Sequence, residues 1–153
     1  RNRLMAISYI HQQLYFTNDF SKLDFASYIT DILALTESTF AHEKVQITTE
    51  LDQVIINIEK AVPCSLILNE LITNCYKHAF KGKSGDKKIF IGLKNKKEKI
   101  ELVIRDNGTG MNKSKKVKNS LGISLINDLV QQLDGEVSWQ KKNGTEVIVK
   151  FRN

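Results

Sequence analysis

The sequence of 153 residues has a single proline, two cysteines and no long apolar run. Its apolar runs are only a few residues long, well short of the roughly 20 residues that span a bilayer. The first residues also lack the pattern of a signal peptide. We therefore expect no membrane contact by this chain and a cytoplasmic location, with membrane attachment of a longer protein left open.

Two cysteines are too few for a disulfide-rich scaffold. Cys64 and Cys75 both fall in one apolar helical pattern, where a thiol usually behaves as a small hydrophobic group. We therefore expect neither a disulfide nor a metal site at these residues. With 41% hydrophobic and 26% charged residues, the composition is that of a globular protein.

The length fits one domain, or one domain with a short helical arm. The sequence starts inside a helical pattern and without an initiating methionine. We therefore expect it to be a piece of a longer protein.

The formal net charge of +6 is compatible with nucleic acid, an acidic partner or a polyphosphate ligand. The lysines, however, gather in short loop-like stretches at 81–88, 94–99 and 113–118 and form no stripe along a helix. This distribution is typical of solvated loops, so we expect no nucleic-acid partner.

Hydrophobic periodicity predicts both helices and strands along the chain. Period-3.6 patterns predict helices at about 1–16, 23–41, 63–80 and 121–133. Period-two patterns and turn residues predict strands at about 45–51, 54–58, 88–93, 100–105, 136–140 and 145–151. Helices that share one chain with antiparallel strands predict an α+β fold, a two-layer sandwich with helices on one face of a mixed, mostly antiparallel sheet.

Turn and breaker residues predict where these elements begin and end. Pro63 is expected in the first turn of its helix, and Gly135 is expected to end the last helix. The strands at 88–93 and 100–105 are expected to form a hairpin through a polar turn at 94–99, and Asn143-Gly144 is expected to form the last hairpin turn.

Three polar features stand beside the predicted core. On the helix at 63–80, Glu70, Asn74 and Lys77 fall on one side, with His78 at its border. Taken alone, these residues are more often the solvated face of an amphipathic helix. The adjoining apolar stripe consists of Leu68, Leu71, Ile72, Cys75 and Ala79.

The second feature is the segment D-N-G-T-G-M at 106–111, which follows an apolar strand, and the third is S-L-G at 120–122, where a loop enters a helix. Glycines after a strand let the backbone approach a ligand, and free N–H groups at a helix start attract phosphate. Each alone is also explained by a tight turn or a serine helix cap. Their order on helix, strand-turn and loop-helix favours a nucleotide site.

The segments N-E-L-I-T-N-C-Y-K-H-A-F, D-N-G-T-G-M and S-L-G-I-S-L resemble the N, G1 and G2 boxes of the ATP-binding fold shared by histidine kinases, gyrase, heat-shock chaperone ATPases and mismatch-repair proteins, the GHKL or Bergerat superfamily. The K-H-A-F ending resembles sensor histidine kinases, and residues 8–15 resemble the I-H-x-x-L-Y segment that follows the phosphoacceptor helix in one of their subfamilies. In that subfamily the phosphoacceptor lies upstream, so His11 is not expected to be phosphorylated. The resemblance implies that residues 1–41 end a dimerisation and phosphotransfer region and form a linker helix, while residues 42–153 form the catalytic ATPase domain.

The resemblance also implies a role for each site residue on the adenine side. Asp106 would accept a hydrogen bond from the exocyclic amine of adenine, since a carboxylate accepts but cannot donate. Gly108 and Gly110 would admit the base, Met111 would lie against its face, and Thr145 would hydrogen-bond near it.

On the phosphate side, Asn74 would ligate Mg²⁺ through its amide oxygen. Lys77 would neutralise phosphate charge and His78 would add a donor. Glu70 would act as general base, or would instead orient the waters on Mg²⁺. The loop residues that would offer backbone amides and a hydroxyl to the phosphates are Ser120, Leu121 and Gly122.

The function implied by the resemblance is that of the ATP-binding catalytic domain of a two-component sensor histidine kinase. Its cofactors would be ATP and Mg²⁺, and it would pass the γ-phosphoryl group to an upstream histidine. The partners would be a response regulator receiver domain and a second copy, in a homodimer formed through the helical region that mostly precedes this chain. On its own this chain would show little autophosphorylation. The alternatives are a GHKL-type serine kinase resembling anti-sigma-factor kinases, or an ATP-binding pseudo-kinase scaffold.

One segment departs from the family pattern. Asn119-Ser120 stands where many histidine kinases have a further glycine, and no phenylalanine-bearing box is found at 112–119. The sequence therefore predicts a short, lysine-rich ATP lid.

Overall fold

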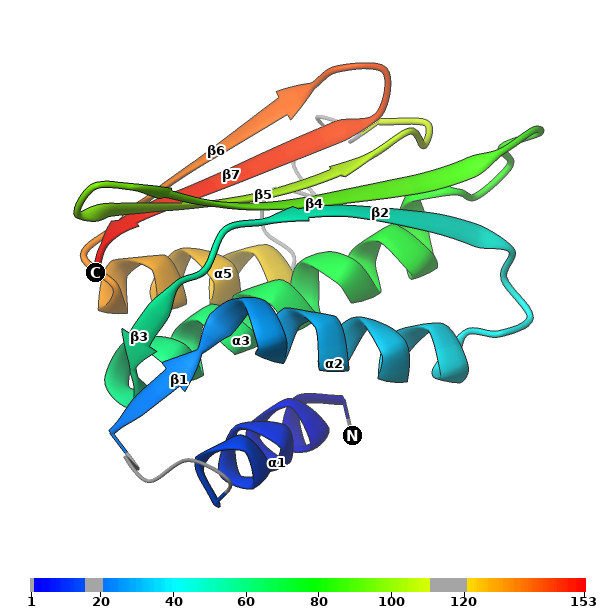
Figure 1. Ribbon diagram of the computed structural model, residues 1–153. Helices are drawn as coiled ribbons and strands as arrows, with labels where there is room; N and C mark the ends of the chain where they lie inside the picture. Colours follow the sequence, from blue (N-terminus) through cyan, green and yellow to red (C-terminus); the bar gives the residue numbers. More distant parts are fainter. Residues whose placement is uncertain (1, 16–20, 111–120) are drawn as a thin grey trace.

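The computed structural model describes residues 2–15, 21–110 and 121–153. Figure 1 shows a sheet covered on one side by helices. The helices are α1 (Asn2–Tyr15), α2 (Phe25–Thr39), α3 (Ile58–Asn74) and α5 (Leu121–Gln132), and a π-helical turn, η1 (Cys75–Ala79), extends α3. The strands are β1 (Lys22–Asp24), β2 (Val45–Leu51), β3 (Ile55–Asn57), β4 (Lys87–Lys96), β5 (Lys99–Asp106), β6 (Glu136–Lys141) and β7 (Thr145–Arg152).

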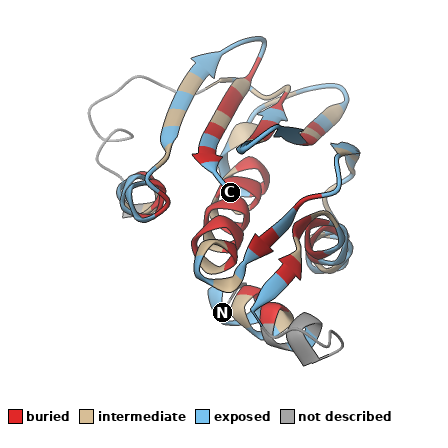
Figure 2. Ribbon diagram, turned by 60° about the vertical axis from the view of Figure 1, so that its left-hand side comes forward, coloured by how far each residue is buried: buried red, intermediate tan, exposed pale blue. Residues whose placement is uncertain are grey.

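The core lies between the main sheet and the helices. Alternate residues of the central strands point to it, among them Ile91, Leu102 and Val149, which are fully buried. This alternation follows from the period-two geometry of a strand. Along α3, buried residues run for most of the helix, which makes α3 the central helix of the layer, as the burial colouring of Figure 2 shows.

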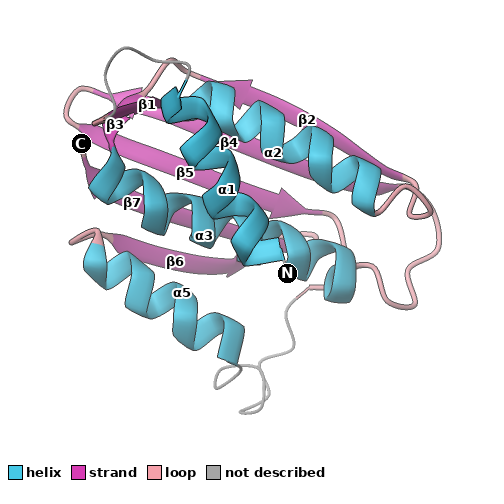
Figure 3. Cartoon of the chain, turned by 90° about the horizontal axis from the view of Figure 1, so that it is seen from below, coloured by secondary structure: helices cyan, strands magenta, loops and turns pink. Residues whose placement is uncertain are grey.

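The main sheet has the order β2-β4-β5-β7-β6. Strands β2 and β4 pair in parallel, and the other neighbours pair antiparallel. Figure 3 shows α2, α3 and α5 spread across one face of this sheet. The prediction of a two-layer α+β sandwich with a mixed, mostly antiparallel sheet is confirmed.

The N-terminal arm, which comprises α1 and β1, is held on the rest of the chain by strand pairing and helix packing. Strand β1 pairs antiparallel with β3, which places Leu23 opposite Ile56, and both side chains are buried. Helix α1 packs on α3 and α2 on the side away from the main sheet (Figure 1). The Tyr28 hydroxyl on α2 donates to the carbonyl of Ala6 on α1 at 3.1 Å.

Two predicted boundaries were wrong. Helix α3 begins at Ile58, directly after β3, so Pro63 lies inside the helix and not in its first turn. Because proline has no backbone N–H, its place inside the helix leaves the carbonyl of Glu59 without the helical hydrogen bond that another residue would donate. The β4–β5 hairpin is also longer than predicted, because residues 94–96 and Lys99 continue the ladder and leave Lys97 and Glu98 to turn, with Lys97 at φ 57°.

Helix ends account for two further differences. The predicted helix to about Phe80 changes at Cys75 into the wider π turn η1. After α5 it is Asp134, at φ 50°, and not Gly135 that adopts the left-handed conformation. Asp tolerates this conformation better than most residues. A Cβ on Gly135 would lie 2.5 Å from the carbonyl oxygen of Lys150, so the glycine serves close packing on β7.

Candidate functional site

Helix α3 presents Glu70 and Asn74 one turn apart, and the start of α5 lies against both. A Cβ built on Gly122 would lie 3.4 Å from Oε2 of Glu70 and 4.0 Å from Nδ2 of Asn74. The structure therefore brings together residues from the first and third boxes that are far apart in the sequence. The backbone of Gly122 thus lies close to both side chains, at the start of α5.

The chain changes helical form directly after Asn74. The π turn η1 carries Lys77 and His78, both exposed. The Cys75 N–H at its start lies within hydrogen-bond distance of the carbonyls of Ile72 and Leu71. Single π turns inside helices are frequent at functional sites. Here the turn begins directly after Asn74 and carries Lys77 and His78.

Asp106 ends strand β5 and is 6% exposed. Its Oδ1 accepts hydrogen bonds from the backbone N–H groups of Gly108, at 2.9 Å, and Thr145, at 3.2 Å. Its Oδ2 has the Cys75 thiol as donor at 3.7 Å. Because a thiol is a weak donor, Oδ2 keeps the capacity to accept a second, stronger hydrogen bond.

Burial and charge act together on Cys75. Desolvation raises the pKa of its thiol well above the ordinary value, and the Asp106 carboxylate beside it raises the pKa further. The group is therefore a neutral donor facing Asp106. Both cysteines are free and buried.

The G1 segment packs its backbone on η1. A Cβ on Gly108 would lie 2.2 Å from the carbonyl oxygen of Ala79, and the N–H of Thr109 donates to that same oxygen at 2.9 Å. The close approach at Gly108 is thus to the protein's own backbone. Gly110 has a φ of +83°, which favours glycine, and lies over the aliphatic part of Lys141.

Four contacts at the site were missed by the sequence analysis. Asn107 accepts from the Lys88 N–H at 2.8 Å and donates to the Asp86 carbonyl at 2.9 Å, which ties the G1 segment to the start of β4. An asparagine in a turn is a signal for such side-chain to backbone bonds. The contacts of Cys75 with Asp106 and of Arg3 with Glu70 join distant residues, and no local pattern could have indicated them.

Thr145 and the loop residues complete the predicted set. Thr145 lies opposite Asp106 in the β5–β7 register, and its backbone N–H holds the Asp106 carboxylate. Met111 and Ser120 lie outside the described residues, as does the predicted lid at 112–119. For Leu121 the structure describes its place at the start of α5 but not its side chain.

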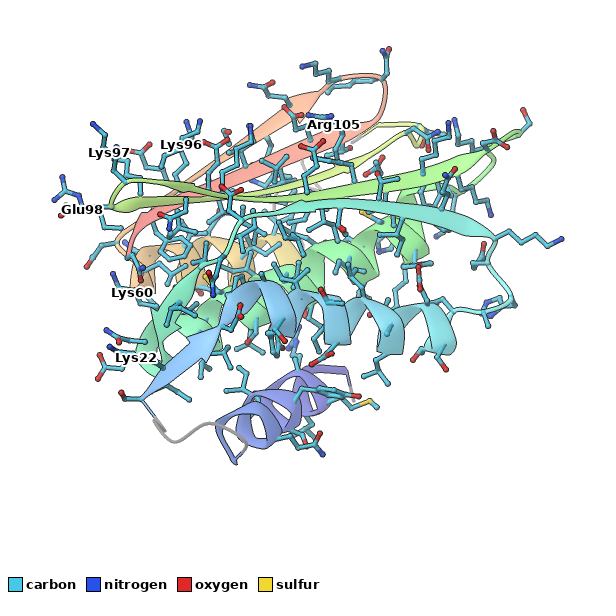
Figure 4. The ribbon with its side chains drawn as sticks, in the orientation of Figure 1. Lys22, Lys60, Lys96, Lys97, Glu98 and Arg105 are labelled. Atoms are coloured by element: carbon cyan, nitrogen blue, oxygen red, sulfur yellow. The ribbon has the colours of Figure 1, made fainter. Side chains whose placement is uncertain are left out.

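Figure 4 labels several basic residues of the chain, among them Lys96, Lys97 and Arg105. Lys96 and Lys97 are at the hairpin turn, which is the opposite end of β5. Arg105 donates to Glu146 at 2.6 Å and its guanidinium lies 5.1 Å from the Phe90 ring centre. Within the described ranges no group of three or more His, Cys, Asp or Glu side chains gathers to hold a metal ion. The Glu70 carboxylate and the Asn74 amide lie near Gly122, and carboxylate and amide oxygens are ligands that suit Mg²⁺.

Residues 59–153, which include all three boxes, match the family model described as histidine kinase-, DNA gyrase B-, and HSP90-like ATPase. The chain belongs to this ATPase family. Residues 1–40 match a second model, described as histidine kinase. The two matches together identify the chain as the ATP-binding domain of a sensor histidine kinase of the GHKL superfamily, and the predicted serine-kinase alternative is not favoured.

Relatives with known names agree with this family. The sensor histidine kinase PdtaS of Mycobacterium tuberculosis is 22% identical over 154 residues, covering 97% of this chain and 30% of PdtaS. The chain therefore spans less than a third of the length of this curated relative.

Solved structures share the fold. The histidine kinase domain of the Erythrobacter litoralis EL346 blue-light activated histidine kinase superposes with a TM-score of 0.88 at 19% identity, covering 99% of this chain and 73% of that one. The Acinetobacter baumannii histidine kinase AdeS gives a TM-score of 0.72 at 17% identity, covering 98% and 75%. None of the helices in the described part of this chain is long and apolar enough to cross a membrane.

Proposed function

We propose that this chain binds Mg²⁺-ATP and supplies the catalytic groups that transfer the γ-phosphoryl group to a histidine upstream of it in a longer protein. The observation that carries the proposal is the meeting of Glu70, Asn74 and Gly122, because it brings a carboxylate and an amide next to the start of a helix. Phosphoryl transfer depends mainly on positioning and charge neutralisation, which such a set can provide.

The adenine side of the proposal rests on Asp106. Its Oδ1 is held by two backbone N–H groups, so its Oδ2 is left to accept a hydrogen bond from the exocyclic amine of adenine. A guanine base presents a carbonyl oxygen there, which a carboxylate cannot bind. This arrangement supports a preference for ATP over GTP. Gly110, Met111 and Thr145 are proposed to border the base.

The phosphate side rests on the residues that follow Glu70 along α3 and η1. Asn74 would hold Mg²⁺, which when bound neutralises phosphate charge. Lys77 and His78, both exposed on η1, would contact the phosphates, together with the backbone of Ser120, Leu121 and Gly122 at the start of α5.

Glu70 is proposed to accept the proton of the attacking imidazole. Its side chain is 13% exposed, so water competes little for the carboxylate. Position and partial burial suit a general base that must stay within reach of a nucleophile arriving from outside the domain.

The proposal extends to the longer protein. Residues 1–41 would end the dimerisation and phosphotransfer region, residues 42–153 would form the catalytic domain, and the protein would act in the cytoplasm as a homodimer that passes its phosphoryl group to a response regulator receiver domain. The match of residues 1–40 to the histidine kinase model supports this arrangement.

The test is phosphorylation of the longer protein with radiolabelled ATP. We expect an acid-labile, base-stable label typical of phosphohistidine, and a strongly reduced but measurable rate of labelling in Glu70→Gln with ADP binding retained. A label that survives acid would contradict histidine transfer and point to a serine or threonine acceptor. Full labelling of Glu70→Gln would contradict the role of Glu70.

A further inference from the structure

An ion pair links the N-terminal arm to the proposed catalytic carboxylate. The guanidinium Nε of Arg3 on α1 donates to Oε1 of Glu70 on α3 at 2.6 Å, across 67 residues of sequence. Arg3 is 49% exposed, whereas Glu70 is 13% exposed. Because the bond is short and the Glu70 carboxylate is largely buried, this contact is stronger than an ordinary surface ion pair.

The two oxygens of Glu70 have different surroundings. Oε1 is engaged by Arg3, and Oε2 is the atom nearest to the Cβ that Gly122 lacks. The carboxylate therefore spans from the arm to the start of α5. A guanidinium that holds one oxygen restricts rotation of the carboxylate and leaves the other oxygen beside Gly122.

Helix α1, which carries Arg3, is held in place by buried contacts. On α1, Ala6 and Ile10 are 1% exposed, and the Ala6 carbonyl accepts a hydrogen bond from the Tyr28 hydroxyl. Arg3 lies one helical turn before Ala6 on this anchored helix, so its reach to Glu70 depends on how α1 docks on α3.

We infer that Arg3 is a positioning residue for Glu70, so that the arm supplies a group that the catalytic domain needs to orient its general base. This inference rests on the proposed function, because it assigns Arg3 to the same phosphoryl transfer. Arg3 acts through Glu70 and does not itself touch the nucleotide.

The test uses the longer protein with Arg3→Gln, Arg3→Lys and, as a control on an exposed site of the same helix, Gln12→Ala. We expect Arg3→Gln to lower the phosphorylation rate at saturating ATP about tenfold, since a charge-assisted hydrogen bond is lost. The KM for ATP and the Kd for ADP should stay within about twofold, because ground-state binding is untouched. Arg3→Lys should recover part of the rate, and Gln12→Ala should match the unaltered protein.

A double variant separates positioning from a merely structural role. When Glu70 is already Gln, adding Arg3→Gln should cause no further loss of rate, because Arg3 acts only through Glu70. A faster phosphorylation rate in Arg3→Gln would overturn the inference, because it would show that the ion pair inhibits the reaction. Equal losses in Arg3→Lys and Arg3→Gln, with a lower Tm in both, would also overturn it and assign Arg3 to docking of α1.

Failure of the proposed function is distinguishable from failure of this inference. If the unaltered protein binds no ADP or forms no phosphohistidine, the proposed function itself is contradicted and the inference falls with it. If the unaltered protein is active and Arg3→Gln is equally active, only the positioning role of Arg3 is contradicted.

Discussion

The Sγ of Cys75 lies 3.7 Å from Oδ2 of Asp106, which joins the first residue of the π turn to the last residue of β5. The neutral thiol donates to the carboxylate, and the backbone N–H groups of Gly108 and Thr145 hold the other oxygen. A residue of the N box therefore takes part in holding the group proposed to recognise adenine. The two boxes are coupled through a buried contact and not only through a shared ligand.

Replacing Asp106 with asparagine should weaken ADP binding. The amide places an N–H₂ group where a carboxylate oxygen accepts, so either the internal hydrogen bonds or the bond to the adenine amine is lost. We expect a loss of affinity of about tenfold to a hundredfold, measured by calorimetric titration. The matched control is Asp128→Asn, which makes the same substitution at an exposed residue of α5. Unchanged ADP affinity in Asp106→Asn would show that adenine binds elsewhere.

Gly108→Ala should destabilise the fold. The added Cβ would lie 2.2 Å from the Ala79 carbonyl oxygen, and backbone at this distance cannot move aside cheaply. We expect a loss of about 1 to 3 kcal/mol in the free energy of unfolding, measured with urea. In Gly92→Ala the nearest atom is a ring carbon of Phe90, at 3.1 Å, so the smaller loss expected there serves as the control. Equal effects of the two changes would contradict the packing of Gly108 on η1.

The two thiols should resist modification in the native chain. Burial raises the pKa of Cys64 and of Cys75 above the ordinary value of 9.0. The native state therefore keeps protons that the unfolded chain releases above about pH 9, so these thiols contribute stability below that pH and lose it as the pH rises further. A disulfide reagent at pH 8 should label neither thiol until denaturant is added. Rapid labelling of the folded chain would contradict the burial of these residues.

The ring of Phe40, which follows α2, stacks on Tyr76 of η1 with centroids 4.5 Å apart and an interplanar angle of 9°. Phe40→Ala should lower the free energy of unfolding by about 2 kcal/mol, and Phe40→Leu by about 1 kcal/mol, because leucine retains apolar volume but loses the stacking. Urea unfolding measures both. If Phe40→Leu were as stable as the unaltered chain, the ring stacking would contribute nothing beyond burial.

The local signals in the sequence predicted most of the fold. The helix carrying Glu70 and Asn74, and the strand leading to Asp106, follow from periodicity that a few neighbouring residues create. The turn at Asn143-Gly144 was also predicted, and its residues have φ values of 50° and 131°. These features depend on short-range preferences, so they can be read without knowing which segments meet.

Features that depend on distant partners could not be predicted in this way. Strand β1 has three residues and exists because β3 pairs with it. The change of α3 into η1 occurs where Cys75 meets Asp106 and Ala79 meets Thr109, contacts made by a strand and a turn about 30 residues further along. The contact of Arg3 with Glu70 likewise needs α1 to be docked on α3. Tertiary contacts select these structures among those that the local sequence allows.

Calorimetric titration of the chain with ADP and with GDP, with and without Mg²⁺, tests the central claim most directly. The account predicts saturable ADP binding in the micromolar range that strengthens with Mg²⁺, and much weaker binding of GDP, because Asp106 is proposed to accept from the adenine amine and Asn74 is proposed to ligate the metal. Equal binding of the two nucleotides would contradict the role of Asp106, and the absence of ADP binding would contradict the nucleotide site itself.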